Sequence, residues 1–224
     1  MCLHINRFLF TIFILFTCTN VYAEGGMIVK VLNDDGKPVE NAVISAKPMD
    51  GEIIKPTTTP PTIIDQIDKT FIDYVTPVIV GTKINFPNND KIRHHVYSFS
   101  PAKKFEIPLY PPGKEPNEPV VFDNPGVVVI GCNIHDWMKA YIYVLDTPYF
   151  AKTKTDGMAV IQGVPVGKYK VEVWHPHLKK SQEVMSHVVD LVKGKDGSVS
   201  FDIKVVDELK KRRAPNSFGG DNYR

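Results

Sequence analysis

Residues 127–145 read VVVIGCNIHDWMKAYIYVL and carry the clearest structural signal in the chain. The runs VVVI and AYIYVL at the two ends of this stretch are rich in β-branched and aromatic residues, which favour strands. Between them, Cys132, His135 and Met138 place a thiol, an imidazole and a thioether within seven residues. We therefore predict a loop between two strands, with three side chains able to bind a metal.

The chemistry of these side chains favours copper. Cysteine supplies a soft thiolate, histidine a borderline nitrogen and methionine a weak axial sulfur, a set that selects copper over hard cations. A trigonal site needs a second histidine, and the polar turn 88–93 leads to one at the start of the alternating run His95–Ser100. The predicted ligands of one copper ion are His94, Cys132, His135 and Met138, with His95 as the alternative to His94.

The rest of the chain indicates an all-β fold. Short β-branched and aromatic runs recur between Gly, Pro, Asn and Asp residues, and no stretch has a persuasive helical period. This spacing is typical of a β-sandwich. The predicted strands are 27–32, 42–46, 71–80, 83–86, 95–100, 105–109, 120–122, 127–130, 140–145, 150–153, 159–161, 169–174, 184–191 and 198–205.

Two domains are expected. A boundary near Asp146–Pro148 separates a first sandwich, residues 24–147, from a smaller β unit, residues 148–206, which is short for an independently stable domain. Residues 207–224 are charged and then rich in Asn and Gly, and we predict a disordered tail. Its basic run, residues 210–213, suggests solvated side chains more than contact with anionic lipid.

The N-terminus has the pattern of a secretory signal. Arg7 precedes an apolar run, 8–16, and small residues follow up to Ala23, where cleavage is expected. The run is too short to span a bilayer, so stable membrane insertion is not expected. A retained anchor and a degenerate lipoprotein site at Cys18 are weaker alternatives. The predicted location is the periplasm.

Cysteine usage and charge narrow the class of protein further. Cys2 and Cys18 lie in the predicted signal, so Cys132 would be the only thiol in an exported chain and has no partner for an intramolecular disulfide. Cys132 could therefore be a metal ligand, form an intermolecular link or remain a free thiol. The chain has 27 basic and 25 acidic residues. Cleavage of the predicted signal would remove Arg7 and leave 26 basic and 25 acidic residues, a net charge of +1. This balance argues against nucleic acid as a partner.

A family resemblance rests on the motifs FPNNDKIRHHVYSFS, residues 86–100, and GCNIHDWM, residues 131–138. The second has the C-x-x-H-x-x-M spacing of amicyanins, and the chain resembles the cupredoxin (plastocyanin/amicyanin-like) family. The family's H-N-V triplet is replaced here by His94-His95-Val96, so the first ligand carries over to His94. The resemblance implies a Greek-key sandwich, blue copper and electron exit through His135.

The whole chain also resembles the type labelled methylamine utilization protein, in which a plastocyanin-like domain precedes a carboxypeptidase-regulatory-like module. The second module is suggested by Thr155-Asp156-Gly157, by Val164–Gly167 and by Tyr169-x-Val171-x-Val173. These motifs are common to transthyretin-like sandwiches. They imply a small transthyretin-like sandwich at the C-terminus, and nothing in them points to methylamine chemistry.

Together these features predict a type 1 copper protein that transfers single electrons between redox partners such as a cytochrome or a dehydrogenase. The chain lacks G-x-S-x-G, H-E-x-x-H and a phosphate-binding glycine loop, and four protein ligands leave no open metal position, so we do not expect an enzyme. A copper carrier or sensor and a structural or adhesion module with a vestigial site are the alternatives. His175 and His177 could form a second metal site but are more typical of solvated or core histidines.

Overall fold

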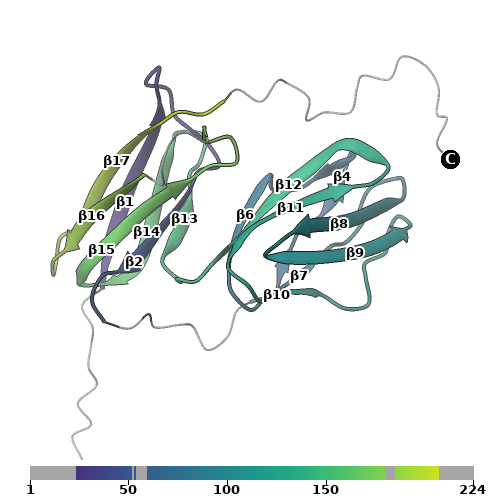
Figure 1. The fold of residues 1–224 in the computed structure, drawn as a ribbon, viewed down its shortest axis with the longest axis horizontal. Helices are drawn as coiled ribbons and strands as arrows, with labels where there is room; N and C mark the ends of the chain where they lie inside the picture. The colour runs from purple at the N-terminus through teal and green to yellow at the C-terminus, as the bar shows by residue number, and fades with distance from the viewer. Residues whose placement is uncertain (1–23, 52, 54–59, 180–184, 207–224) are drawn as a thin grey trace, which may run out of the picture.

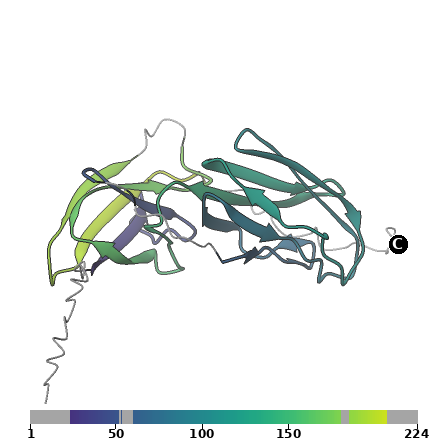
Figure 2. The same ribbon diagram turned by 90° about the horizontal axis from the view of Figure 1, so that it is seen from below.

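The computed structural model describes residues 24–51, 53, 60–179 and 185–206, and this part of the chain consists of strands, turns and loops. The predicted signal and tail lie outside the described residues. Two β-sandwiches lie side by side along the long axis of the molecule (Figure 1). Figure 2 shows the same pair from below. Within the described ranges, no helix has the length and apolar character needed to cross a membrane.

The first sandwich, residues 62–145, contains a five-stranded sheet in the order β6-β12-β11-β8-β9, which faces a three-stranded sheet in the order β10-β7-β3. A two-stranded hairpin, β4-β5, lies between β3 and β6 in the chain. The strands of the first sandwich, including this hairpin, are β3 (Thr62–Ile63), β4 (Gln66–Ile67), β5 (Thr70–Phe71), β6 (Val75–Ile79), β7 (Thr82–Asn85), β8 (His94–Ser100), β9 (Lys103–Tyr110), β10 (Val120–Phe122), β11 (Gly126–Cys132) and β12 (His135–Leu145).

Alternation along β8 and β12 decides which side chains enter the core of the first sandwich. Successive residues of a strand point to opposite faces of the sheet. In β8, His94, Val96 and Ser98 are buried while Phe99 is 79% exposed. In β12, Met138 is buried together with the apolar residues that follow it at alternate positions. The core of Ile, Val and Phe side chains also contains Cys132 and Met138.

The second sandwich combines the two ends of the described chain. One sheet has the order β14-β1-β17 and the other the order β13-β2-β15-β16. Its strands are β1 (Glu24–Asn33), β2 (Val43–Pro48), β13 (Phe150–Lys152), β14 (Met158–Pro165), β15 (Gly167–Trp174), β16 (Ser186–Leu191) and β17 (Gly197–Ile203). Its core is a separate cluster that includes Met27, Ile44, Val171 and Phe201.

The predicted boundary at residue 147 therefore assigned residues 24–48 to the wrong sandwich. β1 is the central strand of its sheet, antiparallel to β14 and parallel to β17, with Val31 opposite Phe201. β2 lies between β13 and β15. The first sandwich is thus an insertion between β2 and β13. The parallel pairing of β1 with β17 joins residues about 170 positions apart and involves no local turn. The sequence pattern therefore did not reveal this pairing.

The single strand expected at residues 71–80 is interrupted. β5 ends at Phe71, the chain bends, and β6 begins at Val75. Asp73 has a φ of 66°, a left-handed conformation that ends an extended run. The short strands before it, β3, β4 and β5, were not predicted, because two-residue strands carry too little alternation to recognise. Residues 56–61 are rich in Thr and Pro, which predicts a loop, but residues 56–59 lie outside the described part.

Aromatic side chains join the two sandwiches. Tyr141 and Tyr143 point outward from β12, and their ring centroids lie 6.1 and 4.9 Å from that of Trp174 in β15. The hydroxyl of Tyr74 lies 2.8 Å from Nε2 of His177, and Lys152 Nζ donates to the Val75 carbonyl at 2.8 Å. The copper ligands predicted from the sequence lie away from this contact, at an end of the first sandwich.

Candidate metal centre

Three of the four predicted ligands converge on one point. Cys132 Sγ lies 3.6 Å from His94 Nδ1 and 3.5 Å from His135 Nδ1, and the three donor atoms all lie within 4.8 Å of one another. All three residues are buried, and the two imidazole centroids are 5.1 Å apart. Within the described residues, this is the group of His, Cys and acidic side chains that could share one metal ion.

Each donor comes from the end of a strand. His94 opens β8, Cys132 ends β11 and His135 opens β12. The connection between β11 and β12 is only Asn133–Ile134, so the donors lie on the strands and not on the longer loop that we expected. β11 and β12 pair regularly from Gly126 to Gly131, which anchors the turn to a rigid sheet.

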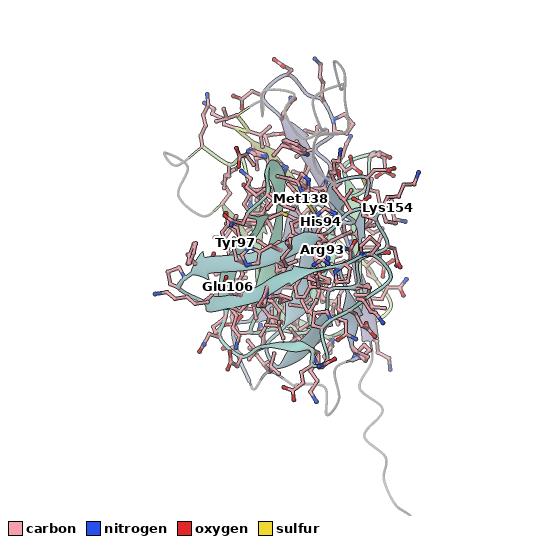
Figure 3. The ribbon with its side chains drawn as sticks, turned by 90° about the vertical axis from the view of Figure 1, so that its right-hand side faces the viewer. Arg93, His94, Tyr97, Glu106, Met138 and Lys154 are labelled. Atoms are coloured by element: carbon pink, nitrogen blue, oxygen red, sulfur yellow. The ribbon has the colours of Figure 1, made fainter. Side chains whose placement is uncertain are left out.

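A bulge allows His135 and Met138 to enter the same core. Residues three apart on a regular strand face opposite sides of a sheet. The pairing of β11 with β12 shifts between Gly131 and Cys132, which changes the direction of the side chains at this point. Met138 is 2% exposed, belongs to the same core cluster as Cys132, and borders with it a surface cavity of about 430 Å³. Figure 3 labels Met138 and His94.

The structure separates the two adjacent histidines. His94 is fully buried, and its Nδ1 faces Cys132. His95 lies on the other face of β8, where its Nε2 is 2.9 Å from Oε1 of Glu106. The alternative first ligand, His95, is therefore directed away from the thiol by strand alternation.

A carboxylate holds the far side of the His94 ring. His94 Nε2 lies 2.8 Å from Oδ2 of Asp90, and the Asp90 side chain is 6% exposed. Burial is the largest influence on the pKa of Asp90 and acts to raise it. Three hydrogen bonds oppose this effect, and together they lower the pKa of Asp90 below its usual value. They come from the Lys69 amide, the His94 ring and the Lys91 amide. Asp90 is thus an anion beside a candidate ligand.

The surroundings of His135 favour its neutral imidazole. Burial lowers the pKa of its imidazole, and the nearby His94 and Lys69 lower it further, against opposing effects of Asp90 and Asp136. A neutral imidazole is the form that binds metals. The centroids of the Trp137 and His135 rings lie 5.4 Å apart, and the ring planes are tilted by 56°. Asp136 is exposed, as is Ile134 at 49%.

A buried polar network supports the turn that carries Asp90. Asn88 is fully buried and donates through Nδ2 to the carbonyls of Ile92 and Tyr110. The Tyr110 hydroxyl donates to the Phe86 carbonyl at 2.8 Å and contacts the Gln66 amide. Burial raises the pKa of Tyr110 to about 12. The sequence pattern did not identify Asp90, Gln66 and Tyr110 as neighbours of the site; for Asp90 the available signal was the polar turn 88–93.

The other candidate histidines lie elsewhere. His177 contacts Tyr74 at the junction of the sandwiches, and its backbone amide donates to Nδ1 of His175 at 3.1 Å. In the described ranges these two histidines are not part of a group with metal-binding spacing.

Comparisons with known proteins found solved structures that are similar to part of this chain. No family model matches the chain, and no curated protein matches it. A copper-containing nitrite reductase from Thermus scotoductus SA-01 is 24% identical with a TM-score of 0.36, over 44% of this chain and 25% of that one. The chain thus spans about a quarter of that enzyme's length.

Two smaller copper proteins are also similar. A purple cupredoxin from Nitrosopumilus maritimus is 22% identical with a TM-score of 0.33, over 37% of this chain and 96% of that one. A variant of amicyanin in its reduced Cu(I) form is 14% identical with a TM-score of 0.35, over 45% of this chain and 99% of that one.

Proposed function

We propose that this chain is a cupredoxin that binds one type 1 copper ion and carries single electrons between redox proteins. The observation that supports this most directly is the buried thiol of Cys132, which lies between Nδ1 of His94 and Nδ1 of His135 at 3.6 and 3.5 Å. One thiolate and two imidazoles are the equatorial donors of blue-copper sites. When bound, copper would supply the one-electron couple between Cu(II) and Cu(I).

The protein's part is to keep the donors in place. His94, Cys132 and His135 are attached to paired strands, and Asp90 and Trp137 restrain the two rings. Donors that are held by a rigid sheet need little rearrangement when the charge of the ion changes. We propose that Met138 would be the weak fourth ligand, because it is buried in the same core three residues after His135.

Electron exchange is proposed at the edge of His135. Exposed Ile134 and Asp136 flank this residue, and partly buried Trp137 lies against its ring. A small, transient interface of the kind used by redox proteins would suit this surface. The proposed partners are soluble redox proteins such as a cytochrome or a dehydrogenase. Four protein donors leave no position for a substrate, which supports a carrier over an enzyme.

Export to the periplasm is part of the same proposal. It is supported by the signal-like pattern that ends at Ala23 and by the free thiol of Cys132, which a metal would occupy in an oxidising compartment. We also propose that the second sandwich is a transthyretin-like, carboxypeptidase-regulatory-like module, supported by its two small β-sheets and the motifs in β14 and β15.

The test is the copper content and spectrum of the purified exported chain. We expect one copper per chain and an intense absorption towards the red end of the visible spectrum, which Cys132→Ser abolishes. His94→Gln should also abolish it, whereas His95→Gln, a change in the adjacent outward-facing histidine, should retain it. A colourless Cu(II) form of the wild type would refute the proposal.

A second measurement separates an electron carrier from a copper carrier or sensor. The copper-loaded chain is mixed with a reduced and then an oxidised soluble cytochrome, and the colour is followed over time. Rapid reversible bleaching with copper retained supports electron transfer. Loss of the ion on reduction supports the copper carrier.

A further inference from the structure

The hairpin β4-β5 and the turn 88–91 form a clamp behind the His94 ring. The backbone amide of Lys69 donates to Asp90 Oδ2 at 2.6 Å, and Asp90 Oδ2 also faces His94 Nε2 at 2.8 Å. The amide of Lys91 donates to Asp90 Oδ1 at 2.6 Å. Both oxygens of this buried carboxylate are therefore engaged, one of them by a residue that is itself a candidate ligand.

The hairpin has a conformation that serves this contact. Asp68 and Lys69, between β4 and β5, have φ values of 49° and 57°, which is the left-handed geometry of a tight two-residue hairpin. Asp65, just before β4, accepts a hydrogen bond from Asn89 Nδ2 at 2.8 Å. The hairpin segment thus contacts the turn 88–91 at Asn89 and at Asp90.

Burial of the Asp90 carboxylate is unfavourable in free energy unless its charge is compensated. An anion removed from water is unfavourable unless it is hydrogen-bonded or paired. Two backbone amides and one imidazole satisfy Asp90, so the charge is retained next to His94. A ligand histidine commonly donates its second ring N–H to a carboxylate, which selects the tautomer and raises the basicity of the ligating nitrogen.

From this geometry we propose that Asp90, held by the β4-β5 hairpin, is a positioning residue that selects the Nε2–H tautomer of His94 and lowers the reduction potential of the centre. In this tautomer Nδ1 of His94 carries a lone pair and is free to bind a metal together with Cys132 Sγ. The two atoms lie 3.6 Å apart. The negative charge stabilises the more positive state of a bound ion in a poorly screened interior. The part that concerns potential rests on the proposed copper function.

The charge is tested by Asp90→Asn in the copper-loaded chain. Asparagine keeps the shape and an acceptor oxygen, so the visible band should persist while the reduction potential rises. The matched control is Asp136→Asn, which removes the same charge from an exposed residue next to His135 in β12 and should shift the potential less. An equal or larger shift in Asp136→Asn, or an unchanged potential in Asp90→Asn, would overturn the tuning role.

The positioning role is tested without copper. Nitrogen-15 NMR of the metal-free wild type reports which ring nitrogen of His94 carries the proton, and we expect Nε2. In Asp90→Ala the Nε2–H form should lose its dominance, whereas in Asp136→Asn it should be retained. A wild-type His94 protonated at Nδ1 would overturn the assignment with no variant needed. This readout stands even if the wild type fails to show a blue-copper spectrum, so the two failures are distinguishable.

Discussion

The Sγ atom of Cys132 lies 3.5 Å from Nδ1 of His135, although the connection between their strands is only two residues long. The bulge at the end of β11 makes this approach possible, because it redirects side chains that regular pairing would place on opposite faces. Met138 follows three residues later in the same core. Its sulfur is the proposed weak fourth donor.

Met138→Leu should keep the visible absorption and raise the reduction potential. Leucine preserves an apolar side chain of similar volume but removes the thioether, and loss of a weak axial donor favours the reduced ion. A volume-conserving core change of this kind costs less than about 1.5 kcal/mol of unfolding free energy. The control is Met27→Leu in the buried core of the second sandwich, where the same change should leave the potential unaltered. An unchanged potential in Met138→Leu would remove Met138 from the ligand set.

The metal-free chain should lose stability as the pH falls below about 6.5. The pKa of His135 is lowered in the folded chain from its ordinary value of 6.5, chiefly by burial, so below that value the unfolded chain binds more protons than the folded chain. Unfolding free energy therefore rises with pH in this window and is lost as the pH falls. Urea unfolding of the metal-free protein at a series of pH values measures the slope.

His135→Gln should flatten this pH dependence, since it removes the group whose pKa is lowered. His187→Gln is the matched control, because His187 is an exposed histidine of the second sandwich. If both variants keep the wild-type slope, burial of His135 is not its source.

The spacing of residues 132–138 and the family resemblance at residues 94–96 indicated which donors could meet. In the structure, the period of two along β8 turns the His94 ring inward and the His95 ring towards Glu106. Asp90 could not be chosen in the same way. Its contact with His94 depends on the shape of an irregular turn and on an amide from a hairpin about 20 residues earlier.

The grouping of strands into sandwiches was the least predictable part of the fold. Local patterns located most strands, but they carry no information on which distant strands pair. β1 lies between β14 and β17, so its burial depends on residues near the other end of the chain. The assumption that neighbouring segments share a domain therefore placed β1 and β2 in the first sandwich.

Tyr110→Phe should destabilise the first sandwich by about 1 kcal/mol, the usual contribution of one hydrogen bond. The hydroxyl of Tyr110 donates to the Phe86 carbonyl and contacts Gln66, and both of these groups are buried. Thermal unfolding of the metal-free protein measures the change. Tyr97→Phe is the control, since the Tyr97 hydroxyl lies on the outer face of β8, and it should have a smaller effect. Equal effects of the two changes would show that the buried network does not contribute.

A fragment of residues 60–146 should fold and bind copper by itself. It contains every strand of the first sandwich and all four proposed ligands. A fragment of residues 148–206 should not fold alone, because it lacks β1 between β14 and β17 and β2 between β13 and β15. Joining residues 24–50 to that fragment by a flexible linker should restore dispersed amide signals in NMR spectra. The control is the same linker joined to residues 62–79, whose strands pair within the first sandwich. Independent folding of residues 148–206 would contradict the inserted arrangement and favour consecutive domains.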